Sequence, residues 1–311
     1  MENVKCLCQD ILQECRKVIV GNEKEIKLMI MSIFSGGHVL IEAVPGTGKT
    51  TLVKTMAKIL GLASERIQFV SDLMPSDILG VTIYDQKDQD FKFRKGPIFT
   101  NILLADEINR AVPRTQSALL EAMEEHQVTI DGNLYALAKP FVVMATQNPV
   151  EFESTFNLPL AQLDRFFVKI SLSYPKAEEE AYMLANMRFV NDLQEVSTIT
   201  QAETLLEIQS TCEAIHVSVE IIGYVMDIIK ATREKKEILV GASPRAAKSL
   251  VQGAKAWAMI QGRDFVTPDD IQELAVPMLA HRMIVNPMGT GAVKGGEAMI
   301  KKIIEETKVR K

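Results

Sequence analysis

The feature that most constrains the fold is a short loop between an apolar run and a helical pattern. The loop, residues 43–50, reads Ala-Val-Pro-Gly-Thr-Gly-Lys-Thr; it follows the apolar residues 38–41 and leads into helical spacing over 50–60. Small residues allow backbone N–H groups to turn inward around a phosphate, and the positive end of the following helix points to the same place. A strand, this loop and a helix in that order predict a phosphate-binding P-loop.

Each later residue of the loop has an expected contact with ATP. Lys49 is expected to reach the β- and γ-phosphates and to act in catalysis, and the Thr50 hydroxyl is expected to bind Mg²⁺. The first glycine of the usual motif is replaced by Ala43, a small residue at a position that closes the turn and does not contact phosphate. We expect the remaining nucleotide contacts from Pro45, Gly46, Thr47, Gly48 and Thr51.

The first part of the chain alternates between helical patterns, such as residues 4–17 and 22–35, and short apolar runs. The runs are nearly continuous in hydrophobicity, as in strands that are buried on both faces of a parallel sheet. They occupy residues 38–41, 68–70, 102–105, 141–145 and 167–170. This alternation predicts an α/β fold, with a P-loop NTPase domain of three layers (αβα) over residues 1–174.

After Pro175 the character of the sequence changes. Helical patterns follow without a convincing strand, at residues 176–190, 201–214, 218–236, 244–262 and 268–281. They predict a smaller, all-α helical lid domain over residues 175–285. A Gly-rich linker at 289–296 and a last amphipathic helix make up the predicted segment 286–311.

Carboxylates and an amide follow two of the predicted strands. Asp106 and Glu107 end the run 102–105; Asp106 can hold Mg²⁺ through water, and Glu107 can polarise the attacking water by accepting its proton. Asn148 follows the run 141–145 and could orient that water by hydrogen bonding. Its spacing alone favours a turn-forming asparagine before Pro149. The P-loop context favours the catalytic role.

Composition excludes several other classes of protein. A net charge of −5 and a pI near 5.6 argue against a non-specific nucleic-acid binder. No apolar run approaches the roughly 20 residues of a membrane span, and the N-terminus lacks the apolar segment of a signal peptide, so we expect a cytoplasmic protein. Cys6, Cys8 and Cys15 lack a second paired cluster that would close a zinc site, and with Cys212 they are expected to be ordinary thiols.

The three motifs resemble the Walker A, Walker B and sensor 1 motifs of AAA+ ATPases. A closer resemblance, to the MoxR family, covers nearly all of the first 285 residues. Six blocks occur in that family's order: DLMPSDILG at 72–80, GPIF at 96–99, DEINRA at 106–111 with TQSALLEAMEE at 115–125, ATQNP at 145–149, LDRF at 163–166 and GASPRA at 241–246.

This resemblance implies further site residues. Arg165 matches the arginine finger, which would enter a neighbouring subunit's site and stabilise charge on the transferring phosphate. Arg245 matches sensor 2 and would couple the nucleotide to the lid. Val20 and Gly21 lie where the family places backbone contacts to adenine. Taken alone, Arg165 would read as a surface ion-pair residue and Arg245 as a solvated helix residue.

Two hairpins are expected, at residues 78–99 and 126–139, the second around the tight-turn pair Asp131 and Gly132. The resemblance implies that they project towards a central pore or a partner face; the alternative is two ordinary surface hairpins.

The resulting prediction is a Mg²⁺-dependent MoxR-type ATPase, chaperone-like, that acts as a homo-oligomeric ring, a hexamer. The resemblance implies that it remodels or matures client protein complexes, with metal insertion as one such role, beside a partner with a von Willebrand factor A domain. An AAA+ motor or loader acting on DNA is the alternative; it would call for a helix-turn-helix or a basic stripe, whereas residues 232–236 are mixed in charge. A nucleotide-gated scaffold has no need of Glu107, and a small-molecule kinase has no need of a trans-acting arginine.

Overall fold

The computed structural model describes residues 1–44, 46–148, 156–185, 193–286 and 292–310. Its centre is a five-stranded, wholly parallel sheet with the strand order β2-β5-β8-β1-β9. The strands are β1 (Val39–Ala43), β2 (Ser64–Gln68), β5 (Ile102–Asp106), β8 (Val142–Gln147) and β9 (Val168–Leu172). The predicted α/β class and parallel sheet are therefore confirmed.

Alternate residues of the central strands face two separate hydrophobic cores. Val39 and Ile41 of β1 belong to one core, whereas Leu40 between them belongs to the other. The first core contains α1 (Glu2–Cys15), α2 (Glu23–Phe34) and α3 (Lys49–Ile59), and the second contains α5 (Pro113–Glu125). Helices thus cover both faces of the sheet, which gives the predicted three layers.

One predicted strand is misplaced along the chain. The apolar run 68–70 was expected to form it, but β2 spans Ser64–Gln68 and is mostly exposed. β2 lies at the edge of the sheet and pairs with β5 alone, so its side chains are not enclosed on both faces. Hydrophobicity therefore does not mark its position. Phe69, just after it, is fully buried, and its N–H donates to the Asp106 carbonyl at 2.8 Å.

The C-terminal part is mainly helical. Its helices are α7 (Ala177–Ala185), α8 (Ala202–Glu213), α9 (Val219–Glu234), α10 (Pro244–Ile260), α11 (Pro268–Leu279) and α12 (Ala292–Glu306). The expectation of no strand in this part is wrong, because β10 (Ile238–Val240) pairs with β11 (Ile284–Val285) in an antiparallel ribbon. Strands of three and two residues are too short to show a period of two in the sequence.

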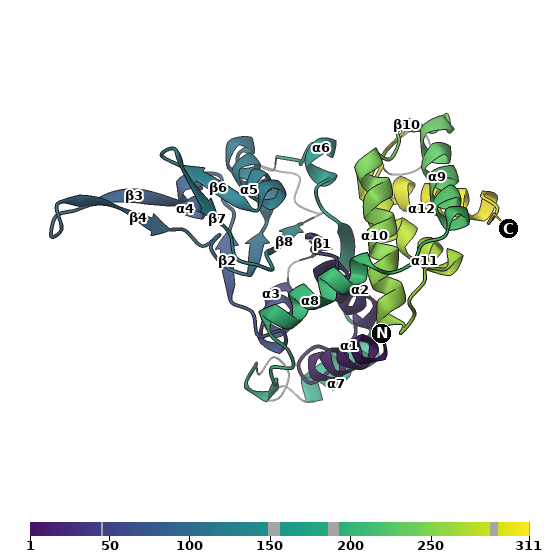
Figure 1. Cartoon of the computed structure of the whole chain (residues 1–311), viewed down its shortest axis with the longest axis horizontal. Helices are drawn as coiled ribbons and strands as arrows, with labels where there is room; N and C mark the ends of the chain where they lie inside the picture. The colour runs from purple at the N-terminus through teal and green to yellow at the C-terminus, as the bar shows by residue number, and fades with distance from the viewer. Residues whose placement is uncertain (45, 149–155, 186–192, 287–291, 311) are drawn as a thin grey trace.

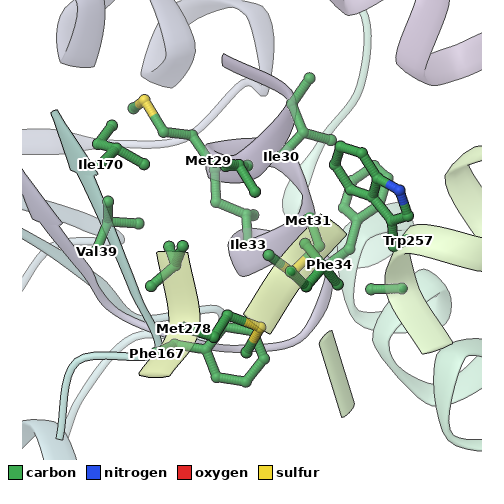
Figure 2. Packing of buried hydrophobic residues seen from close by; sticks show 14 of the residues in the cluster. Met29, Ile30, Met31, Ile33, Phe34, Val39, Phe167, Ile170, Trp257 and Met278 are labelled. Atoms are coloured by element: carbon green, nitrogen blue, oxygen red, sulfur yellow. The ribbon is translucent and has the colours of Figure 1, made fainter. Parts of the chain in front are cut away.

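The nucleotide-binding part and the helical part share one core. Figure 2 shows Met29 and Ile33 of α2 between the sheet residues Val39 and Ile170 and the indole of Trp257 on α10. The predicted boundary at 174/175 falls between β9 and α7; the division into two domains stays a prediction.

The last helix begins earlier than expected. The Gly-rich stretch was predicted to precede it, but α12 starts at Ala292 and includes Gly295 and Gly296. An ideal Cβ at Gly296 would lie 2.9 Å from the carbonyl oxygen of Ala280, so glycine allows α12 to approach the turn η3 (Ala280–Arg282) closely. α12 packs against α9 and α11.

Both predicted hairpins are present. β3 (Gly80–Asp85) pairs with β4 (Asp90–Lys95), and β6 (Gln127–Ile130) pairs with β7 (Asn133–Ala136). Figure 1 shows β3–β4 extending away from the sheet, on the side opposite the C-terminal helices. Phe93 of β4 lies against Tyr135 of β7, with ring centroids 4.3 Å apart, so the two hairpins support each other.

The remaining short elements are α4 (Pro75–Leu79), α6 (Leu160–Leu163), η1 (Ile108–Arg110) and η2 (Leu193–Glu195). Among the described helices, none is both long and apolar enough to cross a membrane.

Candidate nucleotide-binding site

The P-loop lies where β1 ends and α3 begins, at the carboxyl edge of the sheet. Gly46 and Gly48 have φ angles of 83° and 76°, which suit glycine, and an ideal Cβ at either would meet no atom within 4 Å. The loop therefore encloses an open cradle of the kind a phosphate fills. Lys49, the first residue of α3, has its Nζ 3.4 Å from the Ala43 carbonyl, and the Thr47 hydroxyl donates to the Val44 carbonyl at 3.0 Å.

Thr50 and Thr51 continue the first turn of α3 and are half-buried. Pro45 lies outside the described residues. Val20 and Gly21 precede α2, and an ideal Cβ at Gly21 would lie 2.8 Å from Glu179 Oε1, so α7 covers the predicted adenine contact.

Asp106 ends β5 with its carboxylate held on both sides. The hydroxyl of Thr146, on β8, donates to Oδ1 at 2.6 Å, and Nη2 of Arg66, on β2, donates to Oδ2 at 2.7 Å. The Asp106 side chain is only 8% exposed. A buried carboxylate beside the P-loop edge, together with the Thr50 hydroxyl, is the type of oxygen donor that Mg²⁺ prefers, so these residues fit the predicted ion.

Glu107 has a left-handed backbone, with φ 57°, fixed where its N–H donates to the Thr146 hydroxyl at 2.8 Å. Its Oε2 accepts hydrogen bonds from Gln68 Nε2 at 2.7 Å and from Arg110 Nη1 at 3.0 Å. The carboxylate that was predicted to polarise water is therefore tied to two side chains in this state.

Asn148 is buried and directly follows β8. Because β8 lies between β5 and β1, and all three strands run the same way, Asn148 lies between the Asp106–Glu107 pair and the P-loop. The structure thus brings together Lys49, Asp106, Glu107 and Asn148 at one edge of the sheet.

Arg165 and Arg245 lie at the opposite edge of the sheet, where the parallel strands β1 and β9 begin. Arg165 precedes β9, and the pocket that both arginines line also contains His38, which precedes β1. β1 ends at Ala43, so the length of a five-residue strand, roughly 15 Å, separates the two arginines from their own P-loop.

The two arginines meet at one carboxylate. Glu124, near the end of α5, has Oε2 2.9 Å from Arg165 Nε, and its Oε1 pairs with Arg245 Nη2. The structure therefore joins Arg165 and Arg245, which are 80 positions apart in the sequence. It keeps both away from Lys49 of the same chain.

The helical part also holds the segment that carries Arg165. The Ser243 hydroxyl donates to Asp164 Oδ2 at 2.8 Å, and Nη2 of Arg282 donates to the Phe166 carbonyl at 2.6 Å. Arg282 is 1% exposed, and this burial lowers the pKa of its guanidinium to about 10, which leaves it charged at neutral pH. A displacement of the helical part would therefore move Arg165.

Comparisons with known proteins agree with this geometry. A sequence model of the ATPase family associated with various cellular activities (AAA) matches residues 38–168, and a model of the AAA lid domain matches residues 230–303. Chaperone MoxR1 of Mycobacterium tuberculosis is 40% identical over 281 residues, which cover 88% of this chain and 74% of that protein. The protein belongs to the MoxR family of AAA+ ATPases.

Two further relatives have a similar sequence identity to this MoxR ATPase. Protein YeaC of Bacillus subtilis, which is uncharacterized, is 42% identical over 308 residues, covering 99% of this chain and 96% of its own length. A crystal structure of a candidate ATPase from Cytophaga hutchinsonii has a TM-score of 0.90 at 40% identity and covers 99% of this chain and 96% of its own. The predicted MoxR resemblance is confirmed, and a chaperone-like ATPase is the activity that the family supports.

Sequence motifs did not identify several residues of this MoxR ATPase as part of the site. They are the groups that hold the predicted acids and arginines: Arg66, Gln68, Arg110, Thr146, Glu124 and Arg282. The available signal was the alternation of Arg66 and Gln68 on a strand beside β5, which puts both on one face. This signal could be used only if the strand order, with β2 next to β5, was already known.

Proposed function

We propose that ATP is hydrolysed in sites shared between subunits of a homo-oligomeric ring. The observation that carries this is the position of Arg165 and Arg245, at the edge of the sheet opposite the P-loop of their own chain. Arginines that complete an ATP site from that position can serve only a neighbouring subunit. AAA+ proteins commonly oligomerise, and a head-to-tail contact repeated around a closed ring, here a hexamer, supplies this geometry.

Each residue at the carboxyl edge then has a role. Lys49 and the P-loop N–H groups bind the β- and γ-phosphates, and Asn148 orients the attacking water. Glu107 accepts the proton of that water once Gln68 and Arg110 release its carboxylate. Mg²⁺, held through Thr50 and Asp106, would neutralise phosphate charge.

The arginines of the next subunit complete the site. Arg165 stabilises the charge that builds up on the transferring phosphoryl group, as an arginine finger does. Arg245, on the first turn of α10, links the same phosphates to the helical part of the subunit that supplies it. Hydrolysis would then displace that helical part and, with it, the ring's grip on a client.

The work done by hydrolysis is remodelling of client protein complexes. The exposed hairpin β3–β4, with Tyr84 and Phe91 at 53% and 68% exposure, offers an apolar surface for such a client. A partner with a von Willebrand factor A domain and a role in metal insertion are carried over from the family resemblance. A DNA motor is not favoured, because the net charge is −5 and because two relatives carry the names Chaperone MoxR1 and Protein MoxR.

Mixing two inactive variants tests the shared site. Glu107→Gln removes the water-polarising group from a subunit's own site, whereas Arg165→Ala removes the finger that this subunit gives to its neighbour. Each variant alone is expected to hydrolyse ATP at least about 100-fold more slowly than wild type. In a random 1:1 ring, about a quarter of the interfaces combine an intact site with an intact finger, so turnover should return to about a quarter of the wild-type value. No recovery on mixing would overturn the shared site.

A further inference from the structure

Glu124 has two positive partners and lies at the centre of the arginine-bearing edge. Its Oε2 is 2.9 Å from Arg165 Nε, and its Oε1 pairs with Arg245 Nη2, so each carboxylate oxygen serves one arginine. The two arginines come from separate parts of the chain: one precedes β9, and the other is on the first turn of α10. Glu124 is the group through which they meet.

The charge balance leaves this pair of arginines able to bind an anion. One carboxylate offsets only one of two guanidinium charges, so the cluster keeps a net positive charge. The side chains of Arg165 and Arg245 are 29% and 44% exposed. Arg165 Nε, although ion-paired, has no aligned hydrogen-bond partner in the described part of the chain. Glu124 therefore holds Arg165 through its charge and without an aligned hydrogen bond to Nε.

We propose that Glu124 is a positioning residue that holds Arg165 and Arg245 side by side, so that both reach the same triphosphate in the neighbouring subunit. Two like charges repel each other, and a shared carboxylate between them keeps both side chains extended towards the same point. The inference rests on the proposed shared site, and it adds a group that never touches ATP but decides how the two arginines approach it.

The position of Glu124 supports a role beyond an ordinary surface ion pair, which contributes little by itself. Ser243 and Arg282 fix the Arg165 segment from the helical part, and Glu124 fixes it from α5 on the other side. Glu124 is therefore the ion-pair partner that ties the Arg165 guanidinium to α5. Without it, the Arg165 guanidinium would lose its carboxylate on α5, and the link to Arg245 through that carboxylate would be lost as well.

The test is the ATP turnover of Glu124→Gln, which keeps the shape of the side chain and removes its charge. We expect kcat to fall about 10-fold, with ATP affinity and ring mass unchanged, because the P-loop is intact and both arginines are still present. Glu124→Asp keeps the charge on a shorter side chain and should lie between wild type and Glu124→Gln. The matched control is Glu125→Gln, an exposed carboxylate one residue further along α5, which should keep wild-type turnover.

Mixing identifies the site on which Glu124 acts. Glu124→Gln subunits mixed with Glu107→Gln subunits should regain turnover, because intact arginines from the latter then serve the intact sites of the former. Wild-type turnover in Glu124→Gln would overturn the proposal. So would a slow Glu124→Gln that Glu107→Gln does not rescue, when Arg165→Ala is rescued in the same assay. If neither is rescued, the shared site itself is wrong, and the role of Glu124 falls with it.

Discussion

Arg66 on the edge strand β2 binds the carboxylate of Asp106 on β5, with Nη2 2.7 Å and Nε 3.2 Å from the same oxygen, Oδ2. The two residues are separated by 40 positions in the sequence and are joined because β2 pairs only with β5. Arg66 is 46% exposed while Asp106 is 8% exposed, so a half-exposed cation neutralises a buried anion. Any metal ion that Asp106 holds must share this carboxylate with the arginine.

Removing the positive charge of Arg66 should therefore strengthen Mg²⁺ binding. For Arg66→Gln, we expect the Mg²⁺ concentration that gives half-maximal ATPase activity to fall roughly threefold or more, because a cation no longer repels the metal ion. The measurement is a Mg²⁺ titration of turnover at saturating ATP. Lys230→Gln, on the exposed surface of α9, makes the same charge change far from the site and should leave the midpoint unchanged. If the Mg²⁺ midpoint of Arg66→Gln equals that of the wild type, Asp106 does not hold the ion.

His38 should make the protein less stable as the pH falls below neutrality. The ring is fully buried; Nδ1 accepts a hydrogen bond from the Val143 N–H at 3.0 Å, and Nε2 lies 3.1 Å from the Met123 carbonyl, to which it can donate. A second proton has no place in this arrangement, and burial lowers the pKa of His38 from 6.5 to about 4.

The direction of this change in stability follows from proton uptake. Below about pH 6.5 the unfolded chain binds a proton at this histidine and the folded chain does not, so the stability present above pH 6.5 is lost as the pH falls towards 4, by about 3 kcal/mol in all. Between pH 6 and 5, His38→Gln should reduce the slope of unfolding free energy against pH by about 1.2 kcal/mol per unit. Urea unfolding across this range measures it. An unchanged slope in His38→Gln would contradict this origin of the pH dependence.

Gly296→Ala should loosen the docking of α12. Alanine favours a helix by about 1 kcal/mol over glycine, but its Cβ would lie 2.9 Å from the Ala280 carbonyl oxygen, which belongs to backbone that must then move. Overpacking of this kind costs about 1–3 kcal/mol, so we expect a net loss of about 1 kcal/mol in unfolding free energy. Denaturant unfolding should show a lower midpoint for Gly296→Ala and little change for Glu305→Ala, an exposed position on the same helix. A stabilised Gly296→Ala would mean that helix propensity outweighs the contact.

Local chemistry made much of this fold predictable. The P-loop, the turn at Asp131 and Gly132 and the cap of α11, where Thr267 and Asp270 form a capping box, each depend on residues close in the sequence. The buried central strands were recognisable because both of their faces are covered. The edge strand β2 was misplaced because exposure on an edge removes that apolar signature.

The groups that hold the catalytic residues could not be predicted in the same way. Glu124 and Arg245 are 121 residues apart, and Arg282 and Phe166 are 116 apart, so no local pattern links them. Motifs identified Arg165 and Arg245 separately, but only packing shows that they share one carboxylate. Their common position at the edge opposite the P-loop depends on the order and direction of the strands.

The most direct test of the shared ATP site is the molar mass of Glu107→Gln, which should bind ATP but barely hydrolyse it. Light scattering after gel filtration, with and without Mg·ATP, compares the mass with the 34.6 kDa of one chain. If the ATP sites are shared, the mass should shift on adding ATP from a small species to about six subunits, because the nucleotide links one chain's P-loop to the next chain's arginines. A mass that stays at one chain while ATP is demonstrably bound would contradict it.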